Sequence, residues 1–365
     1  MAQALPADAF LSGDRPLIDV RSPGEFTRGH IPGAINLPLF TDPERAVVGT
    51  LYKQEGRDAA LLEGLRITGP KLADLVEQAR RLAPEGRIGV HCWRGGERSA
   101  SVAWLLEKAG FREVCVLAKG YKAFRRHVQT SFVQPLRLKV VGGATGAGKT
   151  ELLAELRLRG AQVVDLEALA AHKGSSFGSI GMPPQPTTEH FENLLWKALR
   201  DLDPRRTLWL EDESATIGRV KIPDSLYRQM REAHVVYMER SAVQRAKRLA
   251  VDYGSGSKED LAAALVRIAK RIGPQHTKAA LEALRNGNLE AVARIALVYY
   301  DKTYAFGLSN RSQEQITKVP ADRMSTTEIA DQLIQHERIE TTCSTTYTRQ
   351  PRGRLWMQDR PGRIG

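Results

Sequence analysis

The chain has 365 residues, more than one ordinary hydrophobic core holds, so we expect at least two domains. Hydrophobic residues make up 42% and charged residues 26%, and no apolar run approaches the roughly 20 residues of a membrane-spanning helix, which excludes a membrane protein. The first residues lack the basic start and the apolar stretch of a secretory signal, so we expect a cytoplasmic location.

The net charge and the cysteine content further narrow the possible classes of protein. Lys and Arg outnumber Asp and Glu by 54 to 42, and the formal charge of +12 suits a polyanionic partner. Part of this excess lies in residues 341–365, where apolar periodicity is lost, and we predict a disordered basic tail there. The 3 cysteines include no CxxC pair, which argues against a disulfide framework and a structural zinc site.

Residues 1–134 alternate short apolar runs with amphipathic stretches, a pattern that is typical of an α/β domain. The predicted strands and helices of this domain are residues 17–20, 71–82, 88–91, 101–108 and 114–117. The pattern restarts with an apolar run at residues 138–141, so we place a domain boundary near Pro135.

Residues 135–340 form the second predicted domain, which is also α/β. Its other strands and helices are predicted at residues 151–158, 162–164, 207–210, 234–238 and 315–319, with a helix opening at 186–188. Residues 241–310 show nearly continuous helical periodicity, which predicts a helical subdomain. A capping box from Ser325 to Glu328 predicts the start of a last helix.

One cysteine lies in a loop with the features of a reactive site. Residues 91–99 read His-Cys-Trp-Arg-Gly-Gly-Glu-Arg-Ser between a buried strand and a helix, so backbone N–H groups should converge near the sulfur of Cys92. Arg94, Arg98 and the helix N-terminus favour the thiolate form. We therefore predict that Cys92 is a nucleophile and that the two arginines belong to its catalytic loop. The alternative is a buried structural cysteine, the role expected for Cys115.

A second loop has the spacing of a phosphate-binding motif. Residues 143–150 read Gly-Ala-Thr-Gly-Ala-Gly-Lys-Thr and lie after an apolar strand and before an amphipathic helix. Backbone N–H groups would surround a diphosphate, Lys149 would neutralise its oxygens, and the Thr150 hydroxyl would hold Mg²⁺. The predicted diphosphate-binding residues are Gly143, Gly146, Gly148, Lys149 and Thr150. A glycine-rich turn without function is the alternative.

Acidic residues near strand ends are candidates to support the metal or the substrate. Glu211 and Asp212 end a buried strand, and Asp165 follows the strand after the phosphate loop. The stretch from Asp165 to Gly178 also contains Lys173, which we predict to contact the polyanionic partner. Solvated acids and an ordinary surface loop are the alternatives.

The cysteine loop, with Leu17 to Phe26 and Gly29 to Pro38 upstream, resembles the rhodanese fold. This resemblance implies a cysteine that carries sulfur or selenium. Five residues separate Cys92 from Arg98, whereas ordinary sulfurtransferases of that fold have four, and the wider loop suits a phosphate-sized anion. The same spacing resembles cysteine phosphatases, so the loop alone does not choose between these chemistries.

A rhodanese-like domain joined to a phosphate-loop domain resembles the bacterial tRNA 2-selenouridine synthase family. The segments Gly49 to Gln54, Asp165 to Gly178, Glu211 to Ser214 and Tyr299 to Tyr304 fit the same resemblance. It implies that 2-thiouridine at the wobble position of tRNA is S-geranylated from geranyl diphosphate, and that selenophosphate then supplies selenium through Cys92. The phosphate loop itself leaves open whether geranyl diphosphate or ATP binds.

The tRNA partner directs attention to basic residues of the helical subdomain. Arg267, Lys270 and Arg271 are spaced to share one helix face, and such a stripe could follow a phosphate backbone. A solvated basic face is the alternative.

Other functions fit parts of the same pattern. A rhodanese-fold cysteine phosphatase or sulfurtransferase with a nucleotide-regulated domain would use Cys92 and Arg98 for another transfer. An ATP-dependent RNA-binding adaptor would use the phosphate loop alone, and the intact cysteine loop argues against it.

Overall fold

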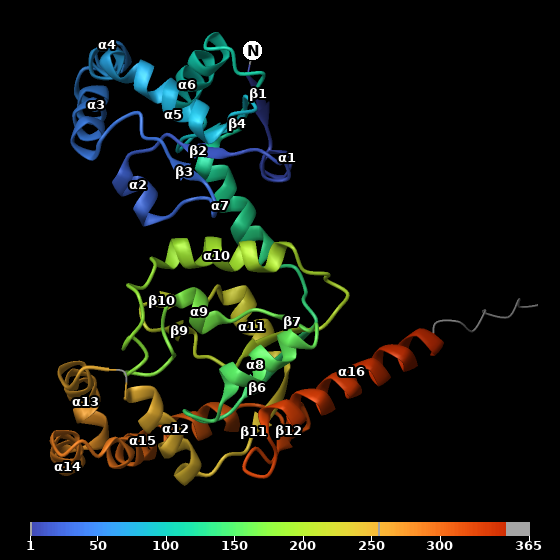
Figure 1. Cartoon of the computed structure of the whole chain (residues 1–365). Coiled ribbons are helices and arrows are strands. Elements are labelled where there is room, and N and C mark those ends of the chain that lie inside the picture. The colour runs from blue at the N-terminus through green and yellow to red at the C-terminus, as the bar shows by residue number, and fades with distance from the viewer. Residues whose placement is uncertain (1, 255, 348–365) are drawn as a thin grey trace, which may run out of the picture.

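The computed structural model describes residues 2–254 and 256–347, with side chains as far as Glu337. Two α/β units lie one above the other, the first coloured blue to teal and the second green to red (Figure 1). Within the described residues, no helix combines the length and apolar character needed to cross a membrane.

The first unit is built on a parallel five-stranded sheet in the order β1-β5-β4-β2-β3. Its strands are β1 (Gln3–Leu5), β2 (Leu17–Asp19), β3 (Ile35–Asn36), β4 (Arg87–His91) and β5 (Glu113–Leu117). Its helices are α1 (Ala7–Leu11), α2 (Pro23–Arg28), α3 (Asp42–Gln54), α4 (Arg57–Thr68), α5 (Leu72–Leu82), α6 (Glu97–Lys108) and α7 (Gly120–Ser131), with a 3-10 turn η1 (Gly69–Lys71). Ile18, Ile88 and Val90 are fully buried, as apolar runs in a covered parallel sheet require.

Helices α3 and α4 are absent from the sequence-based prediction. On α4, Leu61, Leu62 and Leu65 are 42%, 53% and 59% exposed, so its apolar residues do not gather on one buried face. The sequence of α4 therefore lacks the row of apolar residues on one face by which an amphipathic helix is recognised.

The second unit has a parallel five-stranded sheet in the order β12-β11-β6-β8-β7 and a small antiparallel hairpin, β9 with β10. The strands are β6 (Leu138–Gly142), β7 (Gln162–Val163), β8 (Leu208–Glu211), β9 (Thr216–Ile217), β10 (Val220–Lys221), β11 (His234–Met238) and β12 (Ile316–Val319). The helices before the helical subdomain are α8 (Lys149–Leu158), α9 (Leu166–Ala170), α10 (Thr188–Arg200) and α11 (Asp224–Glu232). Because β6 is the central strand, the glycine-rich loop that follows it lies at the middle of the sheet's carboxyl edge.

Four helices that follow β11 form a helical subdomain with its own apolar core. They are α12 (Ala242–Tyr253), α13 (Lys258–Ile272), α14 (Pro274–Arg285) and α15 (Leu289–Ser309), and the turn η2 (Gln313–Gln315) follows.

The last helix, α16 (Thr326–Tyr347), continues through residues 341–347, which we expected to be disordered. The Ser325–Glu328 capping box is formed, and a nucleated helix propagates at low cost. The rest of the predicted tail, residues 348–365, lies outside the described residues.

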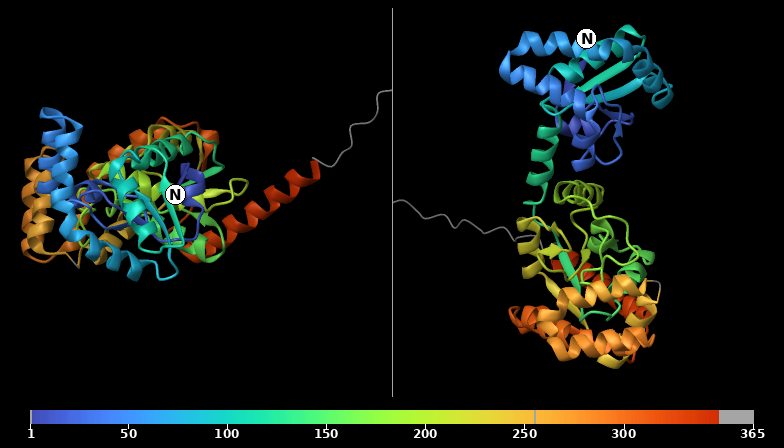
Figure 2. Two further views of the ribbon diagram at one scale, coloured as in Figure 1. Left: turned by 90° about the horizontal axis from the view of Figure 1, so that it is seen from above. Right: turned by 90° about the vertical axis from the view of Figure 1, so that its left-hand side faces the viewer.

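The two units share an apolar core where α7 of the first packs on α10 of the second (Figure 1; from other directions in Figure 2). Phe124 of α7 belongs to the same buried cluster as Phe191 and Leu195 of α10. Arg125 donates to the Oδ1 atom of Asn193 at 2.5 Å beside this cluster. Apolar burial and directional polar contacts together fix the orientation of the two units.

Candidate active sites

The first candidate site is the loop between β4 and α6. Cys92 directly follows β4 and is 3% exposed. Its Sγ atom lies 3.2 Å from the Oγ atom of Ser99, which is in the first turn of α6. The Ser99 hydroxyl also lies 3.1 Å from the carbonyl oxygen of Gly96, so its one proton can turn toward either partner. The strand, loop and helix therefore place the predicted nucleophile beside a hydroxyl that can donate to its sulfur.

The start of α7 holds the cysteine loop through backbone hydrogen bonds. The N–H groups of Tyr121 and Lys122 donate to the carbonyl oxygens of Cys92 and Trp93 at 2.8 and 3.0 Å. Gly120 has a φ of +60°, and a Cβ atom there would lie 2.4 Å from the Cys92 carbonyl oxygen. A side chain at this position would push the loop away. The cysteine loop therefore requires a glycine at position 120, which lies outside the loop itself.

Gly120→Ala should disrupt the cysteine loop. We expect the free energy of unfolding to fall by more than about 2 kcal/mol, because positive φ strains alanine and the Cβ atom meets backbone atoms. Gly110→Ala is the matched control, since Gly110 has a φ of +90° but open space around it, and it should lose about 1 kcal/mol. Chemical denaturation measures both losses, and equal values would contradict this role of Gly120.

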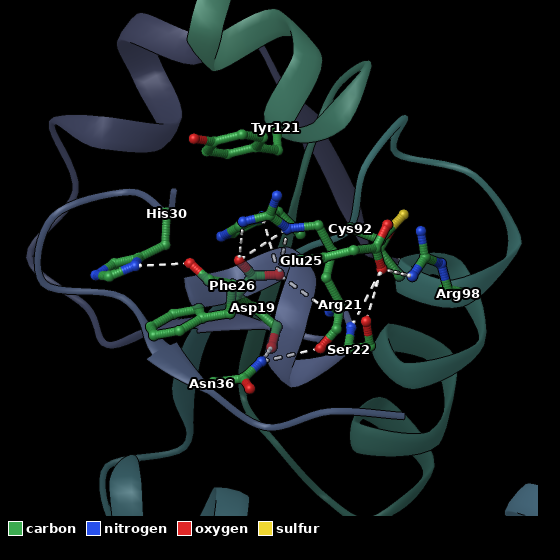
Figure 3. Close-up of polar contacts among 12 residues, drawn as sticks. Asp19, Arg21, Ser22, Glu25, Phe26, His30, Asn36, Cys92, Arg98 and Tyr121 are labelled. Atoms are coloured by element: carbon green, nitrogen blue, oxygen red, sulfur yellow. Dashed lines mark hydrogen bonds and ion pairs between the residues drawn. The ribbon is translucent and has the colours of Figure 1, made fainter. Parts of the chain in front are cut away.

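The two arginines predicted for the loop have different surroundings. The Nη1 atom of Arg98 donates to the Oε2 atom of Glu25 at 2.7 Å (Figure 3). Glu25 belongs to α2, where it completes a capping box with Ser22. Burial opposes ionisation of Glu25, but the hydrogen bond and charge of Arg98, together with the Ser22 N–H and the charge of Arg45, outweigh it and hold the pKa of the carboxyl below its usual value. Arg94 is exposed at the surface of the loop.

A buried polar network that the sequence did not indicate links this loop to the second unit. Asp19 and Arg21 form a buried ion pair at 2.6 Å, and the Arg21 guanidinium lies 3.8 Å from the centroid of the Tyr121 ring (Figure 3). The Tyr121 hydroxyl donates to the Oε1 atom of Glu189 at 2.9 Å and accepts from the Nδ2 atom of Asn193 at 2.8 Å. Because Tyr121 also holds the cysteine loop through its backbone, one residue connects that loop to α10.

The second candidate site is the glycine-rich loop between β6 and α8. Gly146 and Gly148 have φ values of +80° and +95°, and Gly143 has +153°. The Nζ atom of Lys149 donates to the carbonyl oxygen of Gly143 at 3.3 Å. The backbone thus curls around the lysine, the shape that lets successive N–H groups face a phosphate.

Two carboxylates that the sequence prediction missed lie beside Lys149. The Oε1 atom of Glu213 is 4.0 Å from Lys149 Nζ, and the Thr150 hydroxyl donates to the Oε2 atom of Glu167 at 3.3 Å. Burial raises the pKa of Glu213 to about 8 and also raises that of Glu167. Burial works against the charge of Lys149, but the carboxylates outweigh it and raise the pKa of the ammonium group. The acid pair therefore retains a proton at neutral pH, next to a lysine that is charged.

The three acids predicted to support a metal or the substrate make other contacts. Asp165 caps the N-terminus of α9. Glu211 is fully buried, accepts a backbone N–H at 3.0 Å, and has a pKa that burial raises well above its usual value. Asp212 accepts hydrogen bonds from Tyr304 at 3.0 Å and Arg311 at 2.7 Å. These contacts hold the backbone and the helical subdomain in place around the phosphate loop.

Thr150, Glu167 and Glu213 offer oxygen ligands that fit Mg²⁺ in this loop. The described part of the chain contains no group of three or more His, Cys, Asp or Glu side chains suited to a metal ion. Mg²⁺ needs no such cage, because it usually takes one or two carboxylates and fills its shell with water and phosphate oxygens. A bound cation would also offset the repulsion that keeps the buried carboxylates from ionising together.

The loop after α9 packs against the carboxylate pair. A Cβ atom at Gly174 would lie 2.8 Å from the Oε2 atom of Glu213. The helical subdomain holds both backbone polar groups of Ser176, whose N–H donates to the Tyr300 hydroxyl at 3.0 Å and whose carbonyl accepts from Arg267 at 2.7 Å. Arg267 therefore anchors the loop that adjoins the phosphate site.

The residues predicted to contact RNA are exposed. They do not form one continuous row of unbound cations, because two of the arginines make hydrogen bonds within the protein. Arg267 is bound to the loop, Arg271 donates to the Tyr299 hydroxyl at 2.7 Å, and Lys270 lines an open groove between α13 and α14. Lys173 is exposed on the loop after α9.

Comparison with known proteins identifies two matching regions of the chain. A family model described as the tRNA 2-selenouridine synthase AAA domain matches residues 136–337, and a rhodanese-like domain model matches residues 6–127. The tRNA 2-selenouridine synthase of Shewanella denitrificans is 35% identical over 359 residues, 87% of this chain and 95% of that protein. Those of Salmonella typhi and Salmonella arizonae are 35% and 41% identical, covering 83% and 67% of this chain and 92% and 68% of theirs. The predicted two-domain fold class is thereby confirmed.

Proposed function

The chain belongs to the tRNA 2-selenouridine synthase family, and from this premise we propose that it converts 2-thiouridine in tRNA to 2-selenouridine. The modified base is the wobble uridine, and the co-substrates are geranyl diphosphate and selenophosphate. The observation that supports the proposal is that one chain holds two different strand-to-helix loops, one that places Cys92 beside Ser99 and one that curls around Lys149.

The order of the two steps follows from leaving-group chemistry. A thiocarbonyl sulfur does not leave C2 of uridine readily. Attack of that sulfur on the geranyl carbon forms a C–S bond and releases diphosphate, and the S-alkylated product makes C2 electrophilic. Selenide can then add at C2, and the geranyl thiol departs. Alkylation is therefore the activating step and selenium exchange the second.

The phosphate loop serves the first step. Its backbone N–H groups and Lys149 bind the diphosphate and stabilise the negative charge that grows as it leaves. Thr150, Glu167 and Glu213 would hold Mg²⁺, which when bound supplies further charge stabilisation to the leaving group.

The cysteine loop serves the second step. Selenophosphate is an anion of the size that the Cys92–Arg98 loop is spaced to hold, and Cys92 is the nucleophile that acts on it. Lys173, Lys270 and Arg271 are exposed cations on the second unit and are available to tRNA phosphates.

Mass spectrometry of tRNA nucleosides tests the proposal. The full-length protein is incubated with 2-thiouridine tRNA, geranyl diphosphate, Mg²⁺ and selenophosphate, and each co-substrate is omitted in turn. We expect S-geranyl-2-thiouridine without selenophosphate and 2-selenouridine when both are present. Neither product under conditions where tRNA binds would overturn the proposal, and a requirement for ATP in place of geranyl diphosphate would reassign the phosphate loop.

A further inference from the structure

We propose that Cys92 takes the phosphoryl group of selenophosphate and releases selenide, and that it does not carry selenium itself. The inference rests on the proposed function, because it names the step that supplies selenium for exchange at C2. It replaces the expectation, implied by the rhodanese resemblance, that the cysteine accepts selenium.

The electron balance separates the two routes. When the Cys92 thiolate attacks phosphorus, an S–P bond forms, the P–Se bond breaks, and selenium leaves with the bonding pair as selenide, so that no atom changes oxidation state. Water then attacks phosphorus, the S–P bond breaks, inorganic phosphate is released, and the Cys92 thiol is regenerated. When the thiolate attacks selenium, the P–Se electrons stay on phosphorus and the product is phosphite. Only the first route yields selenide, the nucleophile that displaces a thiol at C2.

The cysteine loop has the parts that phosphoryl transfer needs. Five residues lie between Cys92 and Arg98, which leaves room for a tetrahedral oxyanion among the backbone N–H groups. The Oγ atom of Ser99, 3.2 Å from Cys92 Sγ, can donate to the attacking thiolate and later to the sulfur as it leaves phosphorus. Selenide leaves as a stable anion, so the first half of the reaction requires no general acid.

Glu25 is the side chain placed to assist the second half of the reaction. Its Oε2 atom lies 2.7 Å from Arg98 Nη1, so the carboxylate borders the position that Arg98 offers to an oxyanion (Figure 3). A carboxylate at this border can accept the proton of the water that attacks phosphorus. The capping contacts of Glu25 to Ser22 hold it in α2 while it does so.

The chain provides two matched internal controls. Cys115 lies on β5, is 1% exposed, and has a thiol pKa that burial raises, so it should not react. Glu44 completes a capping box with Thr41 and pairs with a cation, as Glu25 does, but its partner is Lys71 at 2.5 Å. Glu44→Gln therefore reproduces the local change of Glu25→Gln at a capping glutamate that pairs with Lys71 instead of with Arg98 of the cysteine loop.

The first test incubates the full-length protein with selenophosphate and no tRNA, and denatures it at neutral pH during turnover. We expect high-resolution mass spectra to show a phosphoryl group on Cys92, without the isotope pattern of selenium, and no adduct on Cys115. Alkylation should trap selenide in proportion to the inorganic phosphate seen by phosphorus-31 NMR. A selenium isotope pattern on Cys92, or phosphite as the phosphorus product, would overturn the inference.

The second test uses variants. Glu25→Gln should raise the phosphorylated fraction of Cys92 at least about tenfold, because hydrolysis loses its base, and Glu44→Gln should not. Equal fractions in the two variants would contradict the role of Glu25. Hydroselenide should restore selenouridine formation from S-geranyl tRNA in Cys92→Ser protein, above the rate without protein. Failure of that rescue, while the wild type makes selenouridine, refutes the cysteine's role; a wild type that makes none refutes the proposed function instead.

Discussion

Cys92→Ser protein is expected to geranylate 2-thiouridine tRNA at the wild-type rate and to make selenouridine at least about 1,000-fold more slowly from selenophosphate. A serine hydroxyl is not ionised at neutral pH, so the helix N-terminus and Ser99 have no thiolate to stabilise. The phosphate loop belongs to the other sheet and does not depend on this sulfur. S-geranyl-2-thiouridine should therefore accumulate, and liquid chromatography with mass spectrometry of the nucleosides measures both products.

Cys115→Ser is the matched control for this result. Its sulfur is buried on β5 of the same sheet, so the substitution introduces the same chemical change without touching the cysteine loop. We expect both tRNA products at close to wild-type rates, with some loss of stability. If Cys92→Ser lost geranylation as well, the division of the two steps between the two loops would be wrong.

The placement of both loops could be predicted because each motif is continuous in the sequence. Cys92 follows the buried strand β4 and Lys149 begins the helix after β6, and an apolar run followed by glycines is a local signal. The same holds for Ser325 and Glu328, whose spacing alone gives the capping box. Helix α4 was missed because its exposed leucines remove the periodicity on which such predictions depend.

The partners of these motifs could not be predicted, because they come from distant parts of the chain. Glu25 and Arg98 are 73 positions apart, and Tyr121 and Glu189 are 68 apart. Choosing them among many surface carboxylates requires the strand order, which brings the ends of β2 and β4 together. The position of Asp212 at the end of a strand made it the predicted acid, but its side chain pairs with Arg311. The next residue, Glu213, is the one that lies beside Lys149 of the phosphate loop. Sequence thus locates the loops, and topology decides which charges surround them.

Lys149→Ala protein is expected to lose geranyl transfer by at least about 100-fold, the effect of removing a preorganised charge from a developing oxyanion. Selenium exchange on tRNA that already carries S-geranyl-2-thiouridine should continue, because Cys92 is unchanged. Single-turnover assays on the two tRNA substrates separate these outcomes. Lys221→Ala is the control, since Lys221 pairs with Asp224 on the surface at 2.8 Å and should leave both steps intact.

Lys149→Ala should also change how the free energy of unfolding depends on pH. In the wild type, burial raises the folded pKa of Glu213 to about 8 from an ordinary value of 4.5, so the unfolded chain binds fewer protons and stability falls as pH rises between these values. Lys149 opposes that shift. Without its charge the pKa of Glu213 should rise further, and the free energy of unfolding should keep falling above pH 8 while that of the wild type levels off. Parallel curves for the two proteins from pH 7 to 9 would mean that Lys149 and Glu213 do not interact.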